Sequence, residues 1–538
     1  MDRRKFIGLG AVASGILLSG KMKVARAIAS QGAPGEIVET SAGKIRGLAQ
    51  NGVLAFKGIP YGAPTGGSSR FMPPGKPQPW AGVRDALELG FRCPQSPSTL
   101  IPEVAAVDRK EPAGEDCLVL NVWTPGAGRS RKRSVMVWLH GGGYSAGSSG
   151  YAIYDGANLA QKQDVVIVGV NHRLNVFGFL YFAEIGGEKY AHSSNVGMLD
   201  LVAALEWVRD NIGAFGGDPG NVTIFGQSGG AGKVSTLMAM PSAKGLFHRA
   251  VIESRPMEKG VPRGEASAAA EEFLSRLGLK PNQIDEAQKL PMEQLVTAMR
   301  AGGLPGNPSL RLEPTVDGQS LPWGMFDPRA TELSANIPLL TGSVETEVAF
   351  IPNQVLDPID DATLHQKVKQ ALGKAGDEQV DQLIQAYRKG RPGVANTDLY
   401  LILASDATFR QGVLAEAERK AAEGKAPAYM YYFTWHSPVR DGKLRAFHTI
   451  EIPFVFGNLD AAKSMTGTGE DRQALSDRMS NAWVAFARTG NPNYAGLPHW
   501  PAFSNQERAT MIFNDECKVV NDPNGEERKM LRSLLANA

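Results

Sequence analysis

The clearest structural signal in this chain is Asn221-Val222-Thr223-Ile224-Phe225-Gly226-Gln227-Ser228-Gly229-Gly230. Its apolar, β-branched first half predicts a strand, the Gly-x-Ser-x-Gly pentapeptide predicts a tight turn, and residues 231–240 are typical of a helix. Between a strand and a helix, this pentapeptide forms a nucleophile elbow that holds its serine in a strained backbone above the edge of a sheet. The pattern therefore predicts Ser228 as a catalytic nucleophile.

A second pentapeptide of the same form, Gly143-Tyr144-Ser145-Ala146-Gly147, also follows an apolar strand. The chain has 61 glycines among 538 residues, so a chance match is expected. The residues that follow, Ser148-Ser149-Gly150, have the composition of a loop and not of a helix. We therefore interpret Ser145 as a loop serine.

Predicted strands alternate with predicted helices along most of the chain, which indicates an α/β fold with a mostly parallel, doubly wound central sheet. The uninterrupted apolar run 164–170 is typical of a strand buried on both faces of such a sheet, and residues 195–212 predict a long helix. Residues 264–312 and 361–423 are polar and helical in pattern, and we expect them to be insertions over the sheet. We expect a hairpin at 36–40 and 44–47, and strands at 118–123, 135–139, 164–170, 221–225, 250–252, 338–341, 429–433 and, as the last, 510–513.

The length of 538 residues would suggest several domains. No linker or internal repeat divides the chain, however, and we expect one catalytic domain over residues 35–538. The net charge of +2 gives no indication of a nucleic acid or an anionic membrane as partner. No His-Glu-x-x-His pattern occurs, and Gln227 stands where a phosphate-binding loop requires glycine. We therefore expect neither a metal nor a cofactor.

The N-terminus has the features of an export signal. Paired arginines at positions 3 and 4 precede a modestly apolar run to about Gly20, and small-x-small patterns stand at 25–27 and 27–29. These features predict a twin-arginine-type signal peptide over residues 1–29, cleaved after Ala27 or Ala29, and export of a bacterial protein by the twin-arginine machinery to the periplasm or beyond. The alternative is a membrane anchor, but the run is short for a bilayer-spanning helix. We expect no stable membrane insertion after cleavage.

A serine hydroxyl needs a base, and the base needs an orienting acid. In a doubly wound hydrolase the acid and then the histidine follow the serine along the chain. His448, in a loop that leads into a proline-broken apolar segment, is our candidate base. Glu345 and Glu347 both follow the strand at 338–341, where a triad acid is required. The pattern does not choose between them, and both could be solvated loop charges.

The tetrahedral intermediate of acyl transfer needs hydrogen-bond donors for its oxyanion. His140-Gly141-Gly142-Gly143 directly follows the strand at 135–139, and its glycines let backbone N–H groups approach a developing charge. The amide of Gly229 adds a donor from the elbow. The alternative interpretation of this run is a flexible turn.

With these motifs in place, the chain resembles the type-B carboxylesterases, the family that includes the cholinesterases, over nearly everything after the signal. Residues 215–230 are similar to the serine signature of that family, and residues 115–122 resemble its second signature. Residues 56–62, 171–173 and 483–501 are further matches. The resemblance implies an α/β-hydrolase fold and the hydrolysis of a small or medium carboxylic ester through an acyl-enzyme, without a cofactor.

Residue by residue, the resemblance implies Ser228 as nucleophile, Glu347 as acid and His448 as base. It also implies Gly142, Gly143 and Gly229 as oxyanion donors, and a disulfide between Cys93 and Cys117.

The chain departs from the family at three places. Thr346 and Val348 stand where the family usually has Asp and Gly, and Arg255 stands where it commonly has Gly. Arg255 could favour an anionic substrate or pair with a surface carboxylate. The loop 93–117 lacks the tryptophan that stacks on choline, which argues against a choline ester. A non-catalytic binding or adhesion protein on the same fold is the alternative function, but it would normally have a damaged triad.

Overall fold

The structure is a computed structural model that describes residues 33–97, 100–300 and 310–536. The predicted signal peptide, residues 1–29, lies outside these ranges. Within them, no helix is long and apolar enough to cross a bilayer.

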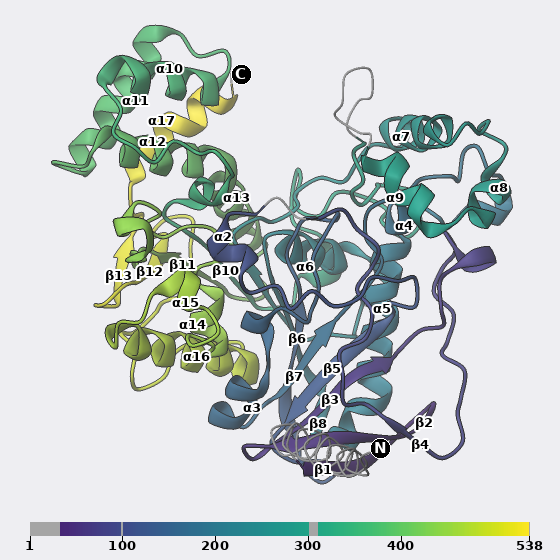
Figure 1. The fold of residues 1–538 in the computed structure, drawn as a ribbon. Helices are drawn as coiled ribbons and strands as arrows, with labels where there is room; N and C mark the ends of the chain where they lie inside the picture. Colours follow the sequence, from purple (N-terminus) through teal and green to yellow (C-terminus); the bar gives the residue numbers. More distant parts are fainter. Residues whose placement is uncertain (1–32, 98–99, 301–309, 537–538) are drawn as a thin grey trace, which may run out of the picture.

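One sheet of 13 strands runs through the protein (Figure 1). From β7 to β12, in the spatial order β7-β6-β8-β9-β10-β11-β12, every pair of neighbours is parallel. The pairs β1–β2, β2–β3, β3–β5 and β5–β7 at one side and β12–β13 at the other are antiparallel, and β4 pairs with β2. The strands are β1 (Ala33–Thr40), β2 (Gly43–Gln50), β3 (Val53–Pro60), β4 (Val83–Asp85), β5 (Val119–Thr124), β6 (Arg133–Leu139), β7 (Val166–Val170), β8 (Gly217–Gln227), β9 (Arg249–Glu253), β10 (Leu339–Val344), β11 (Ala428–Phe433), β12 (Ala509–Phe513) and β13 (Lys518–Asn521).

This topology confirms the predicted α/β class with a mostly parallel central sheet. The prediction that residues 510–513 form the last strand is wrong, because β13 follows and pairs with β12. Three strands were missed, β3, β4 and β13. β3 is largely buried, but Gly58 and Pro60 give its second half the composition of a turn. β4 and β13 are short and largely solvent-exposed, so they lack the apolar pattern that marks the buried strands.

Two hydrophobic cores lie on the two faces of the sheet. Side chains alternate between faces along β6: Val135, Val137 and Leu139 join one core, whereas Met136 and Trp138 join the other. A sheet that is apolar on both faces must be covered by helices on each face. The parallel sheet is therefore doubly wound, as predicted.

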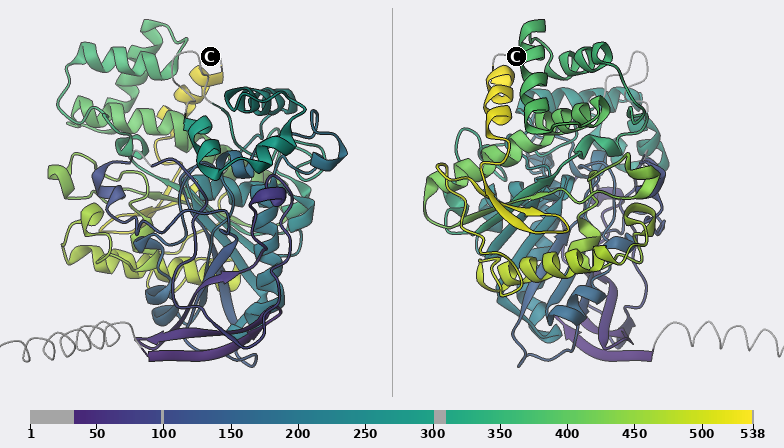
Figure 2. Two further views of the ribbon diagram at one scale, coloured as in Figure 1. Left: turned by 45° about the vertical axis from the view of Figure 1, so that its right-hand side comes forward. Right: turned by 90° about the vertical axis from the view of Figure 1, so that its left-hand side faces the viewer.

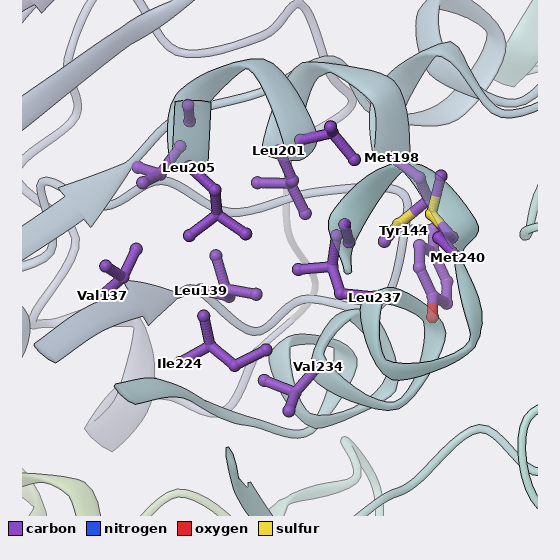
Figure 3. Close-up of a cluster of buried hydrophobic side chains, with 14 of the residues drawn as sticks. Val137, Leu139, Tyr144, Met198, Leu201, Leu205, Ile224, Val234, Leu237 and Met240 are labelled. Carbon is purple, nitrogen blue, oxygen red and sulfur yellow. The ribbon is translucent and has the colours of Figure 1, made fainter. Parts of the chain in front are cut away.

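Each core is closed by a different set of helices. Figure 3 shows the first core, where Val137, Leu139 and Ile224 of the sheet face leucine and valine side chains of α5 (Val196–Asn211) and α6 (Gly229–Ala239). The second core includes residues of α3 (Ala157–Gln163), α14 (Ile452–Phe456) and α16 (Asp471–Thr489).

Two groups of helices lie at the end of the molecule where the parallel strands end, one at each side (Figures 1 and 2). They correspond to the predicted insertions at 264–312, of which 301–309 are outside the described residues, and at 361–423. In the second group α10, α11 and α12 share a small core with the C-terminal α17. The first group is α7 (Arg263–Arg276), α8 (Ile284–Lys289) and α9 (Met292–Arg300); the second is α10 (Asp361–Leu372), α11 (Asp377–Gly390), α12 (Asn396–Ser405) and α13 (Gln411–Glu423) with α17 (Gly525–Ala536); short helices are α2 (Pro102–Ala105), α4 (Asn175–Gly178) and α15 (Lys463–Thr466).

Candidate active site

The strand, tight turn and helix of the nucleophile elbow are all present. β8 ends one residue before Ser228, α6 begins one residue after it, and Ser228 itself has φ 58° and ψ −122°. Such a backbone is costly for a residue with a Cβ atom, and it persists only where the surroundings impose it. A Cβ at Gly226 would lie 2.6 Å from the carbonyl carbon of Gly230, and one at Gly230 would lie 2.0 Å from the carbonyl oxygen of Leu139. The sharp turn therefore requires both glycines.

The second pentapeptide has no such geometry. Ser145 lies in a turn after β6, and its Oγ donates only to the carbonyl of Gly142 at 3.4 Å. No α-helix follows it directly. The interpretation of Ser145 as a loop serine agrees with this placement.

Three glycine amides converge beside Ser228. Gly142 and Gly143 both have positive φ (91° and 62°), a conformation that favours glycine. A Cβ added to Gly229 would lie 2.4 Å from the amide nitrogen of Gly143, so the loop and the elbow are in direct backbone contact. None of the three amides donates a backbone hydrogen bond within the described ranges. They can therefore serve an oxyanion at this place.

His448 is held by a buried carboxylate. Its Nδ1 lies 2.5 Å from Oε2 of Glu347, and both side chains are buried, with exposed fractions of 2% and 0%. Oε1 of Glu347 accepts a hydrogen bond from the amide of Val344 at 3.0 Å. A carboxylate in this position fixes the imidazole tautomer and stabilises the imidazolium that forms when the ring takes up a proton.

The chain brings these two residues together by aligning the segments before them. Thr346 and Phe447, which directly precede the glutamate and the histidine, form an isolated parallel β-bridge beyond the ends of β10 and β11. The amide of Thr346 donates to the carbonyl of Ala446 at 2.9 Å, and its hydroxyl donates to the carbonyl of Leu444 at 2.9 Å. Thr346 replaces the aspartate that is usual in the resembled family, and it has this structural role here.

Glu345, the competing acid, points elsewhere. Its Oε2 lies 2.7 Å from Nε2 of His436 and 2.9 Å from a guanidinium nitrogen of Arg445. Burial raises the pKa of Glu345, but the hydrogen bond from His436 and the charge of Arg445 outweigh this effect and lower the pKa overall. The structure thus separates the two glutamates that the sequence pattern left as alternatives.

Three residues around the imidazole were not anticipated from the sequence. The rings of Phe350 and Phe409 lie 4.5 Å and 5.1 Å from the ring of His448, and Nε2 of Gln227 lies 3.2 Å from its Nδ1 and 3.3 Å from its Nε2. Ser228 Oγ makes no hydrogen bond to this ring in the structure; catalytic hydrogen bonds are often long before substrate binds. Phe409 comes from the helical insertion, and no local pattern marks it.

A buried lysine supports the oxyanion loop. Nζ of Lys233, on α6, donates to the carbonyl of His140 at 2.8 Å. Complete burial lowers the pKa of Lys233 to about 7 and that of the neighbouring His140 well below its usual value. Lys233 is thus part of the support for the glycine run, and its only signal in the sequence is a single cation in an otherwise apolar helix.

Two more carboxylates are buried behind the site. Glu253, at the end of β9, accepts a hydrogen bond from Nε1 of Trp483 at 2.6 Å, and burial raises its pKa to about 8. Glu451 accepts from the hydroxyl of Ser254 at 3.2 Å, and burial raises its pKa well above the usual value. Burial therefore favours the neutral form of both groups.

The disulfide predicted between Cys93 and Cys117 is not present in the structure. Both residues are buried and free. Sγ of Cys93 accepts a hydrogen bond from the amide of Leu174 at 3.2 Å, and contact with the Cys93 thiol, together with burial, raises the pKa of Cys117 well above its usual value. The two side chains are thus adjacent, buried and free thiols.

All of the candidate reacting groups open into one cavity of about 1070 Å³. Ser228, His448 and the three glycines Gly142, Gly143 and Gly229 line it, and so do aromatic and apolar side chains from the loops above. Within the described ranges, no group of three or more His, Cys, Asp or Glu side chains is placed to hold a metal ion. The arrangement is suited to nucleophilic attack by a serine on a carbonyl carbon.

Comparison with known proteins gives a consistent result. The carboxylesterase family model matches residues 34–531. The chain is 37% identical over 504 residues to para-nitrobenzyl esterase of Bacillus subtilis, covering 92% of this chain and 98% of the relative. It is 31% identical over 507 residues to phenmedipham hydrolase of Pseudarthrobacter oxydans, covering 93% and 99%.

A solved carboxylesterase of Geobacillus stearothermophilus superimposes with a TM-score of 0.79 at 36% identity, over 92% of this chain and 99% of that one. A structure of para-nitrobenzyl esterase gives the same TM-score at 35% identity, again over 92% and 99%. The range matched by the family model, residues 34–531, includes the central strands, both helical insertions and the site. The chain therefore belongs to the carboxylesterase family, whose chemistry is the hydrolysis of carboxylic esters.

Proposed function

We propose that the protein hydrolyses a small or medium carboxylic ester through an acyl-enzyme formed on Ser228, without a cofactor. The observation that carries this proposal is that the strained Ser228, three free glycine amides and His448, which Glu347 holds from behind, all meet at one cavity. A binding protein on the same fold would not need to keep all of these parts.

In the first half of the reaction, Oγ of Ser228 attacks the ester carbonyl while Nε2 of His448 takes up the hydroxyl proton. Glu347 holds the Nδ1–H of the ring and stabilises its positive charge. The amides of Gly142, Gly143 and Gly229 donate to the oxyanion of the tetrahedral intermediate. When the intermediate collapses, His448 returns the proton to the leaving alcohol.

In the second half, water attacks the acyl carbonyl, and His448 acts again as base and then as acid. The carboxylic acid leaves and the Ser228 hydroxyl is restored. The phenyl rings of Phe350 and Phe409 hold the imidazole in one place through both halves, because they pack against its ring.

The test is pre-steady-state kinetics with p-nitrophenyl butyrate, with and without a prior treatment with an organophosphate. We expect a burst of one p-nitrophenol per protein, abolished by the inhibitor, with the phosphoryl label on Ser228. Ser228→Ala should lose the burst and the label, whereas the matched variant Ser145→Ala should keep both. A folded wild-type protein with neither turnover nor label would instead favour a non-catalytic binding protein.

We further propose that residues 1–29 direct export by the twin-arginine machinery to the periplasm or the medium. The paired arginines and the small residues before Ala27 and Ala29 support this proposal. N-terminal sequencing of the protein recovered from the periplasm of the producing bacterium should begin just after one of these alanines. Recovery of the intact N-terminus from the cytoplasm alone would contradict it.

A further inference from the structure

Within the described part of the chain, the active-site cavity contains one cation that has no ionic partner. Four other charged side chains line the cavity, and each has an ionic partner. Arg255 also lines the cavity, is solvent-exposed and forms no ion pair within the described ranges. The pairs of the other four are Glu258–Arg419 at 2.6 Å, Lys259–Asp327 at 3.1 Å, Arg311–Glu265 at 3.2 Å and Arg311–Glu313 at 3.3 Å.

The backbone of Arg255 is fixed beside the nucleophile. The carbonyl oxygen of Glu253 accepts hydrogen bonds from the amide of Ser228 at 2.9 Å and from the amide of Arg255 at 3.1 Å. Between them, Ser254 has a φ of 76°, and its amide donates to the carbonyl of Gly342 at 2.8 Å. One buried carbonyl thus holds both residues, and the arginine side chain starts within a few ångströms of the elbow.

The side chain of Arg255 extends toward the histidine side of the cavity. Its guanidinium carbon lies 6.0 Å from the centre of the Phe409 ring, and that ring lies 5.1 Å from the ring of His448. Stacking on an aromatic face holds a guanidinium while its N–H donors stay available. The donors of Arg255 are therefore presented to the space above the reacting groups.

No nearby carboxylate is available to neutralise this charge. Glu253 and Glu451 are fully buried and bonded to Trp483 and Ser254, and burial favours their neutral form, because it raises the pKa of Glu253 to about 8 and that of Glu451 well above its usual value. Glu258, three residues along the chain, is engaged by Arg419. The stretches 98–99 and 301–309, outside the described ranges, contain no acidic residue.

From these contacts we infer that Arg255 binds a carboxylate carried by the substrate, so that the enzyme prefers an ester with one negative charge to a neutral ester of the same shape. This inference rests on the ester hydrolysis proposed above and specifies its substrate class. The carboxylate belongs either to the acyl part, as in a half-ester of a dicarboxylic acid, or to the alcohol part, as in an ester of a hydroxy acid. A planar guanidinium fork matches either carboxylate with two parallel hydrogen bonds.

The experiment uses two pairs of isosteric esters. In the acyl-side pair, mono-p-nitrophenyl succinate is compared with p-nitrophenyl succinamate, whose terminal amide is neutral. In the alcohol-side pair, 4-(butyryloxy)benzoate is compared with 4-(butyryloxy)benzamide. For each pair the ratio of kcat/KM for the anionic ester to kcat/KM for the neutral ester is measured on the full mature protein.

For one of the two pairs we expect Arg255→Gln to lower this ratio by about tenfold to a hundredfold, the loss typical of a hydrogen-bonded charge pair. The pair that responds identifies the side that carries the carboxylate. Arg255→Lys should keep part of the preference, since it keeps the charge but not the fork. The matched control Lys259→Gln removes a lining cation that already has a partner, and it should leave the ratio unchanged.

An unchanged ratio in both pairs with Arg255→Gln would overturn the assignment of Arg255, while turnover of the neutral esters would show that ester hydrolysis itself stands. If the wild-type protein hydrolyses none of the four esters and Ser228 is not labelled by an organophosphate, the proposed function fails and this inference fails with it.

Discussion

Two carboxylate–histidine pairs lie beyond the end of β10, and they differ in almost everything except their chemistry. Glu347 and His448 are 2.5 Å apart, and the histidine is 2% exposed. Glu345 and His436 are 2.7 Å apart, and the histidine is 43% exposed. The same two residue types thus pair at similar distances, and of the two histidines only His448 lines the cavity with Ser228.

The difference lies in what else each carboxylate contacts. Arg445 lies 2.9 Å from Glu345 and 3.1 Å from Asp398, so Glu345 belongs to a surface ion-pair network. Among the residues that the structure describes, Glu347 has only the imidazole and one backbone amide as hydrogen-bond partners. Arg445 already balances the charge of Glu345, so this carboxylate stabilises an imidazolium only weakly. Glu347, in contrast, gains its counter-charge when His448 takes up a proton. Burial and the absence of a competing cation therefore distinguish the pair that we propose is catalytic from the structural pair.

The largest test removes each histidine in turn. We expect His448→Ala to lower kcat for p-nitrophenyl butyrate by about 10⁵- to 10⁶-fold, because the general base is lost. His436→Ala, the matched change in the exposed pair, should stay within about twofold of the wild type. Steady-state kinetics on both variants checks this, and similar losses in the two would remove the distinction between the pairs.

The next test keeps the shape of each glutamate and removes its charge. Glu347→Gln should lower kcat by about 10⁴-fold, since the amide no longer stabilises the imidazolium and favours the wrong tautomer. Glu345→Gln should change kcat by less than about threefold. The same kinetic assay decides the matter, and a larger loss for Glu345→Gln would identify Glu345 as the triad acid.

A smaller effect separates burial from function. Glu253 is as buried as Glu347 but has no imidazole beside it, and burial raises its pKa to about 8. Its folded pKa lies above its unfolded value of 4.5, so the folded protein binds the extra proton between these two pH values. The contribution of protonated Glu253 to the unfolding free energy is fully present below about pH 4.5 and is lost as the pH rises toward 8. Relative to Glu253→Gln, we expect the wild type to lose up to about 1.4 kcal/mol of unfolding free energy per pH unit within this window.

Urea unfolding of both proteins at pH 5, 6.5 and 8 measures this slope. Glu345→Gln is the control of opposite sign, because its folded pKa is lowered overall. The stabilisation from ionised Glu345 is present above the unfolded pKa of this side chain and is lost only as the pH falls below that value. The difference in unfolding free energy between Glu345→Gln and the wild type should therefore be constant from pH 5 to 8. A flat difference for Glu253→Gln as well would mean that Glu253 is ionised throughout.

Much of the fold and half of the site follow from local sequence. The elbow and the oxyanion loop are each contiguous, and each requires glycine at places where a Cβ would strike a neighbouring backbone. The apolar runs of the central strands and the periodic pattern of α5 were sufficient to predict the parallel sheet. Edge strands β4 and β13 escaped prediction because exposed strands carry no apolar signature.

The local sequence pattern could not identify the candidate triad acid. Glu345 and Glu347 stand in the same loop with the same chemistry, and a family resemblance, not periodicity, pointed to Glu347. Its partner His448 is 101 residues away in the chain, and the two meet through the β-bridge between Thr346 and Phe447. Local sequence does not encode such a register.

The sequence by itself determined the candidate motifs of the site: a serine in an elbow, a glycine run after a strand, a later acid and a later histidine. These depend on backbone conformations that a few neighbouring residues impose. Only the tertiary structure decided which glutamate holds His448, which rings pack on it, and which cation in the cavity lacks a partner. Those outcomes depend on burial and on contacts between side chains distant in sequence, and both exist only once the sheet has aligned its strands.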